Sequence, residues 1–184
     1  MIDSSLSLEK INFLGYTERD WIQLLDGQGY KKFHAGQIMK WIHHRFISDF
    51  SEMSDIGKNL RDHLSMRGNL KEPRVKKEFV STDGTRKWLI ESFSGKLFEL
   101  VYIPEKSRGT LCVSSQVGCA LQCDFCSTGK LGFSNDLTAA EIVGQIRIAI
   151  RRLAEIFPEN KKRSVSNIVF MGMGEPLLNL PNVL

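Results

Sequence analysis

Three cysteines lie within eight residues of one another, at Cys119, Cys123 and Cys126. Thiolates are the soft ligands that iron–sulfur clusters select, and a cubane cluster takes four ligands. Three protein thiolates would therefore leave one iron open to a further ligand. The spacing predicts a cluster-binding loop that holds a reactive iron.

Two other interpretations of these cysteines stay open. Cys112 could be the fourth ligand of a structural zinc site, although such sites pair two short cysteine knuckles and Cys112 lies alone, seven residues before Cys119. Cysteines also serve as small buried apolar side chains, but three at this spacing are unusual in that role. All four cysteines fall between positions 112 and 126. In a reducing compartment this crowding favours metal or redox chemistry over disulfides.

A second candidate segment follows an apolar run that begins at Ile168. It reads Gly172-Met-Gly174-Glu175-Pro176, and glycines let the backbone approach a ligand closely. Gly-x-Gly after a strand also occurs in plain turns and in nucleotide-binding folds, but the rest of the dinucleotide fingerprint is missing here. Because it would lie beside the cysteine loop, the segment is a candidate for binding a ligand.

The elements around these two segments predict a strand–helix–strand unit. Residues 110–115 and 166–171 have the pattern of short strands, and Thr138 with Glu141 forms a capping box that opens a helix to Phe157. The predicted core face of this helix consists of Ile142, Ile146, Ala149, Ile150 and Leu153. Such a crossover makes the two strands parallel, and ligands of parallel sheets bind where the strands end. We expect both segments to face one pocket.

The preceding residues predict a change from helices to strands. Helices are expected after Thr17, from His34 to Phe46, and from Ile56 to Met66; Trp41 and Phe46 lie on an apolar stripe and are expected in the core. A three-stranded meander is then predicted, with strands at 75–81, 87–92 and 97–103. The fold class is α/β, with a helical domain at 1–70, a β-meander linker at 71–108 and a further α/β region at 109–184.

The motif Cys119-x3-Cys123-x2-Cys126, with Phe125 before the last cysteine, resembles the signature of the radical S-adenosylmethionine (radical SAM) superfamily. The wider context resembles the RlmN/Cfr family of RNA methyltransferases, and its RlmN branch most. The segments that carry this resemblance are Gln37 to Ile42, Asp83 to Lys87, Glu99 to Pro104, Arg108 to Cys119, Cys126 to Gly129 and Gly172 to Asn179. It covers nearly the whole chain and implies a helical accessory domain before a partial (βα)6 barrel, of which this sequence holds the opening.

The resemblance implies two cofactors, a [4Fe-4S] cluster and S-adenosylmethionine. Cys119, Cys123 and Cys126 would bind the cluster, whose open iron chelates S-adenosylmethionine and whose electron yields a deoxyadenosyl radical. Gly174 and Glu175 would hold the amino group of the methionine moiety. A flavodoxin-type protein would supply the electron.

The implied reaction is the formation of 2-methyladenosine in 23S rRNA and tRNA. Carbon 2 of adenine is electron-poor, so a carbon radical adds there where an ordinary methyl transfer would fail. Glu99 matches the family's proton acceptor, and Cys112 its second catalytic cysteine, which forms a transient disulfide with a methyl-carrier cysteine from the carboxyl-terminal region. That carrier is absent from this sequence, so we expect no methylation by the chain alone. Without the resemblance, Glu99 would be a solvated strand residue and Cys112 a buried one.

Composition is compatible with an RNA partner without requiring one. The 184 residues include 25 Lys and Arg against 21 Asp and Glu, and each local basic group is more typical of a solvated face. The amino-terminal helices, with Lys31, Lys32, His43, His44 and Arg45, would help to bind RNA.

The sequence shows no sign of membrane insertion or secretion. No stretch approaches the ~20 apolar residues of a membrane span, and no secretory signal is recognisable. We expect a cytoplasmic monomer, with a zinc-stabilised nucleic-acid-binding module as the alternative function.

Overall fold

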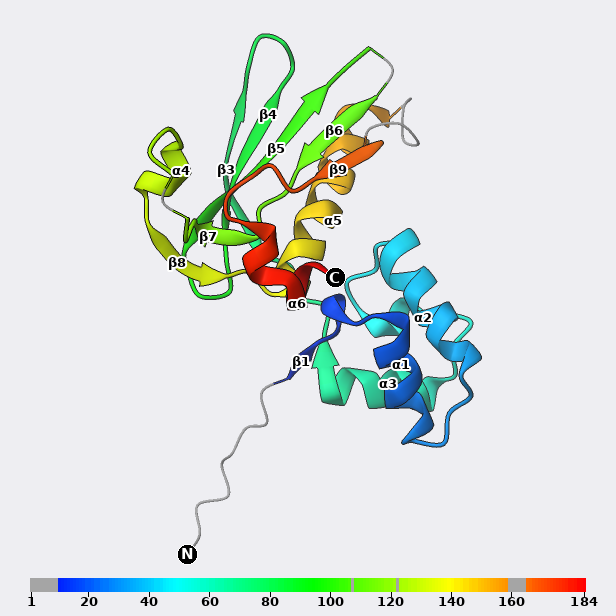
Figure 1. The fold of residues 1–184 in the computed structure, drawn as a ribbon. Coiled ribbons are helices and arrows are strands. Elements are labelled where there is room, and N and C mark those ends of the chain that lie inside the picture. Colours follow the sequence, from blue (N-terminus) through cyan, green and yellow to red (C-terminus); the bar gives the residue numbers. More distant parts are fainter. Residues whose placement is uncertain (1–9, 107, 122, 159–164) are drawn as a thin grey trace, which may run out of the picture. The chain divides into compact units, whose positions relative to one another are not determined.

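The computed structural model describes residues 10–106, 108–121, 123–158 and 165–184. They fall into two compact units, Met1–Lys71 and Glu72–Leu184. Figure 1 shows helices in the first unit and a sheet with one long helix in the second. The basic group at residues 161–163 lies outside the described residues.

The described residues of the first unit form three α-helices, two short 3-10 helices and two short strands. Its elements are β1 (Ile11–Asn12), η1 (Phe13–Gly15), α1 (Glu18–Asp26), α2 (Phe33–His44), η2 (Phe50–Glu52), α3 (Lys58–Arg67) and β2 (Gly68–Asn69). Thr17 caps α1 as predicted, since its side chain accepts a hydrogen bond from the Asp20 N–H and the Asp20 carboxylate accepts one from the Thr17 N–H. Trp41 is buried, whereas Phe46 lies beyond the end of α2 and is half-buried. The predicted helix is therefore present as α2 but ends at His44, before the predicted end near Phe46.

The second unit contains a five-stranded mixed sheet. Its strands are β3 (Arg74–Val80), β4 (Arg86–Glu91), β5 (Leu97–Pro104), β6 (Gly109–Cys112) and β9 (Asn167–Val169), hydrogen-bonded in the order β3-β4-β5-β6-β9. The predicted meander is present as β3, β4 and β5, and β6 and β9 are parallel as expected. Because Val101 of β5 pairs with Cys112 of β6, the meander and the strand–helix–strand unit form one continuous sheet.

A short ribbon leaves this sheet and was not predicted. β6 ends at Cys112 instead of continuing to Ser115, and β7 (Gln116–Gly118) then pairs with β8 (Phe133–Asp136) in an antiparallel two-stranded ribbon. The cysteine segment connects these two strands. A short helix, α4 (Ser127–Lys130), lies within the connection.

The long helix α5 (Ala139–Ile156) covers one face of the sheet. Thr138 and Glu141 form the predicted capping box. Ile142, Ala149 and Leu153 are buried as expected. The predicted face was displaced, however, because Ile148 is buried while Ile146 and Ile150 are half-buried. After β9 the chain ends in η4 (Pro176–Asn179) and α6 (Leu180–Val183).

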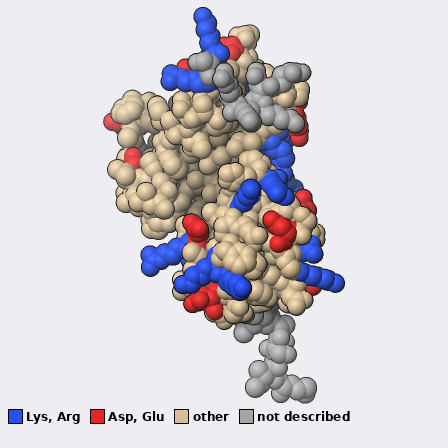
Figure 2. Space-filling model, turned by 90° about the vertical axis from the view of Figure 1, so that its right-hand side faces the viewer, with Lys and Arg blue, Asp and Glu red and all other residues tan. Residues whose placement is uncertain are grey.

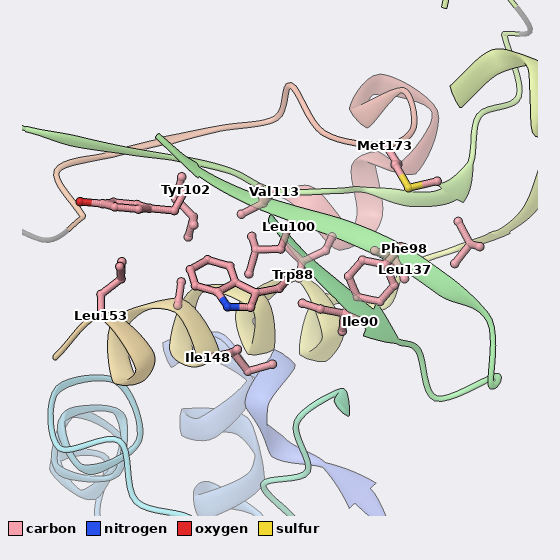
Figure 3. Packing of buried hydrophobic residues seen from close by; sticks show 14 residues of the cluster. Trp88, Ile90, Phe98, Leu100, Tyr102, Val113, Leu137, Ile148, Leu153 and Met173 are labelled. Atoms are coloured by element: carbon pink, nitrogen blue, oxygen red, sulfur yellow. The ribbon is translucent and has the colours of Figure 1, made fainter. Parts of the chain in front are cut away.

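The main core lies between α5 and the sheet. Figure 3 shows side chains of β4 and β5, including Trp88 and Leu100, directed toward α5, where Ile148 and Leu153 meet them. Trp88 and Leu100 have no exposed surface. Burying large aromatic and aliphatic side chains in this way is the main source of folding free energy. The described strands form an open sheet and do not close into a barrel.

None of the described helices combines the length and apolar character that a membrane crossing requires.

Candidate functional site

The cysteine loop is closed at its base by two glycines. The backbone of Gly118 has φ +77°, and a side chain there would collide with the Gly132 carbonyl oxygen. The Cys119 N–H donates a hydrogen bond of 3.1 Å to that same oxygen. Only glycine combines this left-handed conformation with so close an approach. The chain therefore leaves β7 and returns to β8 through a narrow neck, with the three cysteines beyond it.

The three cysteines of the loop differ in environment. Cys119 is buried, Cys123 and Cys126 are half-buried, and all are free thiols. The backbone N–H groups of Gly129 and Thr128 lower the pKa of the Cys126 thiol, and Cys126 is the residue that precedes α4. Within the part of the chain that the structure describes, no three His, Cys, Asp or Glu side chains are grouped to hold a metal ion. The predicted ligands thus share a loop without forming an assembled site.

The glycine segment lies directly beside the start of the cysteine loop. The Ser115 N–H donates to the Met173 carbonyl oxygen at 2.9 Å, and the Met173 N–H donates to Ser114 Oγ, also at 2.9 Å. Ser114 is further held by Gln145 of α5, whose side-chain amide accepts from the Ser114 N–H at 2.8 Å and donates to its carbonyl oxygen at 2.9 Å. The two candidate segments are therefore fixed to each other and to the helix.

Gln116 joins the same segments through its side chain. Its Oε1 accepts a 3.0 Å hydrogen bond from the Glu175 N–H, and its Nε2 donates to Asp136 at 2.8 Å. Gly174 has φ +95°, and a Cβ there would lie 2.5 Å from Gln116 Cβ. Gly174 is thus required by both conformation and space. The Glu175 carboxylate accepts a hydrogen bond from the Leu177 N–H and caps η4.

Glu99 and Cys112 lie on the face of the sheet opposite α5. Directly paired residues of antiparallel strands share a face, and residues two apart along a strand do as well. Val101 pairs with Cys112, so Glu99 and Cys112 are diagonal neighbours on this open face. Glu99 forms an ion pair with Lys87, with 3.0 Å between Nζ and Oε1. The structure therefore places Glu99 and Cys112 on the same face of the sheet.

A cavity of about 380 Å³ lies against this open face. It is lined by Lys87, Leu89, Leu97, Phe98, Glu99, Ser127, Thr128, Leu131 and Met173. Its walls thus come from the sheet, from α4 just after Cys126, and from the glycine segment. As expected, both candidate segments contribute to one pocket.

The four cysteines are unpaired, so the disulfide expected of Cys112 is not supported. Cys112 is 9% exposed, and burial raises the pKa of its thiol. The Cys112 thiol is therefore protonated and poorly nucleophilic at neutral pH.

The chain is similar to known proteins over most of its length. Residues 11–69 match the family of ribosomal RNA large subunit methyltransferase N-terminal domains. Proteins from Pseudomonas putida F1 and Pseudomonas fluorescens SBW25, both named dual-specificity RNA methyltransferase RlmN, are 52% and 51% identical over 178 residues, which is 97% of this chain and 46% of each relative. Over the region that it shares with them, this chain belongs to the RlmN family. It spans about half the length of the curated relatives that it matches.

A solved structure supports the RlmN-family assignment at the level of the fold. It is a radical SAM methyltransferase from Sphaerobacter thermophilus, 34% identical, with a TM-score of 0.79. The match covers 94% of this chain and 50% of that protein. The mixed α/β fold of this RlmN-family chain is therefore that of a radical SAM methyltransferase over most of its length.

Several polar residues around the site of this RlmN-family chain were not predicted as part of it. They are Lys87, Ser114, Gln116, Gln145 and Asn179, and Asn179 donates to the carbonyl oxygens of Ser115 and Leu137. Most lie within or next to the segments that carry the family resemblance. A polar side chain at a position expected to be buried could have indicated them, because such side chains are hydrogen-bonded in native proteins.

Proposed function

We propose that this chain forms the cluster- and cofactor-binding part of a radical SAM RNA methyltransferase that makes 2-methyladenosine in 23S rRNA and tRNA. The observation that carries the proposal is the shared pocket. Glu99, the residues just after Cys126, and Met173 of the glycine segment all line one cavity on the open face of the sheet. RNA and a flavodoxin-type reductant are the proposed partners.

The cysteine loop fits a [4Fe-4S] cluster by its donor set. Cys119, Cys123 and Cys126 are free thiols on one short connection with a fixed neck, and the lowered pKa of Cys126 favours the thiolate form that binds metal. Bound there, the cluster would supply the open iron and the electron that convert S-adenosylmethionine into a carbon-radical source. The chain's own contribution would be to bind and orient the cofactor.

Gly174 and Glu175 are proposed to bind the methionine amino group. Gly174 packs closely against Gln116, and the Glu175 N–H donates a hydrogen bond to Gln116, so both residues are held in place. The Glu175 carboxylate already accepts one backbone N–H from Leu177, and a carboxylate has further lone pairs for an ammonium group. The Glu175 carboxylate therefore keeps capacity to accept a hydrogen bond from an ammonium group.

Glu99 and Cys112 are proposed to act on the RNA base. Glu99 lines the cavity, and Cys112 is its diagonal neighbour on the same face of the sheet. Glu99 would accept the proton from carbon 2, and Cys112 would help to remove it. Lys87 holds the Glu99 carboxylate in place through their 3.0 Å ion pair.

Anaerobic reconstitution with iron and sulfide tests the cluster assignment. We expect a brown protein with about four irons and four sulfides per chain. Cys123→Ala should lose the colour, because two thiolates do not retain the cluster. Cys112→Ala is the matched control and should keep it, since Cys112 is not a proposed ligand. Added S-adenosylmethionine should change the electron paramagnetic resonance spectrum of the reduced cluster.

Two results would contradict the proposal. A colourless protein that holds one zinc ion and loses it in Cys112→Ala would instead favour a zinc-stabilised nucleic-acid-binding module. Loss of the iron in Cys112→Ala and Cys123→Ala alike would exclude Cys112 from its proposed role outside the cluster.

A further inference from the structure

An exposed aromatic side chain lies on the same open face as the proposed site. Phe79 of β3 is 42% exposed. The Nζ atoms of Lys77 and Lys87 lie 4.7 Å and 5.4 Å from the centre of its ring. Both distances are within the range of cation–π attraction. Two ammonium groups therefore lie near the ring while much of its surface stays accessible.

The strand register connects this ring to the proposed site. Phe79 pairs with Lys87, Lys87 with Val101, and Val101 with Cys112, so these four residues form one row across the open face. Adjacent strands are about 4.8 Å apart, which separates Phe79 from Cys112 by roughly 14 Å. Glu99 lies in the neighbouring row and bonds to Lys87. A ligand that extends along the row from Glu99 would meet the Phe79 ring.

Folding does not account for this arrangement. The hydrophobic core of the unit is on the α5 side, and Phe79 contributes nothing to it. Lysines on an edge strand can protect it from pairing with other chains, but an exposed phenylalanine has the opposite effect. Lys77 forms no ion pair with any residue in the described ranges, so its charge is available to a ligand.

We propose that Phe79, Lys77 and Lys87 form a stacking platform for an unpaired RNA nucleotide that flanks the base bound at Glu99. This inference rests on the proposed function and names residues for its RNA contact. Unpaired bases stack on exposed aromatic rings of sheets, and lysines beside them contact the phosphates. The ring and the flanking positive charges suit this ligand better than they suit an apolar protein segment.

The helical unit offers a less specific surface. On the face that Figure 2 shows, its basic and acidic side chains are interspersed. Such a surface attracts RNA weakly and without selecting unpaired bases. The sheet platform is distinguished by an accessible aromatic ring with two cations close to it.

Fluorescence anisotropy of this chain with a labelled single-stranded RNA of about ten nucleotides tests the platform. We expect Phe79→Ala to weaken binding by about 5- to 150-fold, because each base that stacks on an aromatic ring contributes about 1–3 kcal/mol. Phe79→Trp should bind as tightly as the unaltered chain or tighter. Phe79→Leu keeps an apolar side chain without a ring and should bind nearly as weakly as Phe79→Ala.

Phe157→Ala is the matched control. Phe157 is 39% exposed, close to the value for Phe79, and lies at the carboxyl end of α5 on the covered side of the sheet. Its substitution should leave RNA binding unchanged. A fully paired RNA of the same sequence should bind less tightly and should not distinguish Phe79→Ala from the unaltered chain, since its bases are not available for stacking.

The role of Lys77 is tested by salt dependence. Lys77→Gln should reduce the slope of log affinity against log salt by about 0.7, the value for one contact to a single-strand phosphate. Unchanged affinity in Phe79→Ala, equal losses in Phe79→Trp and Phe79→Ala, or no RNA binding by the unaltered chain would each overturn the platform. Cluster assembly is measured separately, so these failures are distinguishable from a failure of the proposed function.

Discussion

The two faces of the five-stranded sheet come from alternate residues of the same strands, yet their environments differ. Toward α5, Trp88 and Ile90 are completely buried. On the opposite face, the side chains of Lys87 and Glu99 are 43% and 40% exposed. One face therefore supplies most of the folding free energy, and the other presents charged and reactive groups. Substitutions on the two faces should have separable effects.

The largest effect on stability is expected at Trp88. Replacing it by alanine leaves a cavity between α5 and the sheet and should cost about 3–5 kcal/mol, measured by urea denaturation. Trp88→Phe should cost much less, because it keeps most of the apolar area and removes an indole N–H that has no hydrogen-bond partner in the described structure. A loss below about 1 kcal/mol in Trp88→Ala would contradict the division between the faces.

A smaller loss is expected at Ser114, where the sheet passes into the cysteine loop. Its hydroxyl donates to the Glu99 carbonyl oxygen and accepts from the Met173 N–H. Ser114→Ala leaves both groups without their partner and should cost about 1–3 kcal/mol. Ser115→Ala is the control, since the Ser115 hydroxyl is buried without a partner in the described residues. Equal losses in the two variants would show that the network around Ser114 does not stabilise the chain.

The ion pair on the open face should contribute least to stability. Lys87→Gln breaks a contact between two side chains that are each about two-fifths exposed, so we expect a loss of at most about 1 kcal/mol. Added salt should reduce the difference further. A loss above about 2 kcal/mol in urea denaturation would mean that this face also carries folding free energy.

The smallest expected change is one of rate, with no loss of stability. Burial raises the pKa of Cys112, and the N–H groups of Gly129 and Thr128 lower that of Cys126. Because the thiolate is the reactive form, alkylation of Cys126 by iodoacetamide should become fast at a lower pH than alkylation of Cys112. Peptide mass spectrometry of the metal-free chain across a pH series measures both profiles. Coincident profiles would contradict the assigned environments.

Local patterns in the sequence predicted the elements well. The capping residues Thr17 and Thr138 gave correct helix starts, since a side-chain cap depends on residues only three positions apart. The three strands of the meander were also located from their alternation. Family resemblance, not periodicity, singled out Glu99 and Cys112.

Contacts between distant residues were not predictable in this way. The pairing of β5 with β6 joins the meander to the following strands, and no local pattern distinguishes it from a separate linker. The β7–β8 ribbon is short and contains Gly118, which sequence patterns assign to turns. Arg147 is buried in α5 against Glu72, 75 positions earlier in the chain, so hydrophobic periodicity could not predict that this charged residue belongs to the buried side of the helix.

The side-chain amide of Gln145 makes the two hydrogen bonds with the Ser114 backbone that a neighbouring β-strand would otherwise make. It accepts from the Ser114 N–H and donates to the Ser114 carbonyl oxygen. Conversion of this amide to a carboxylate by spontaneous deamidation would remove the donor and set a negative charge against the Ser114 carbonyl oxygen. Chemical ageing at this one side chain would thus weaken the attachment of the base of the cysteine loop to α5 without altering any cysteine.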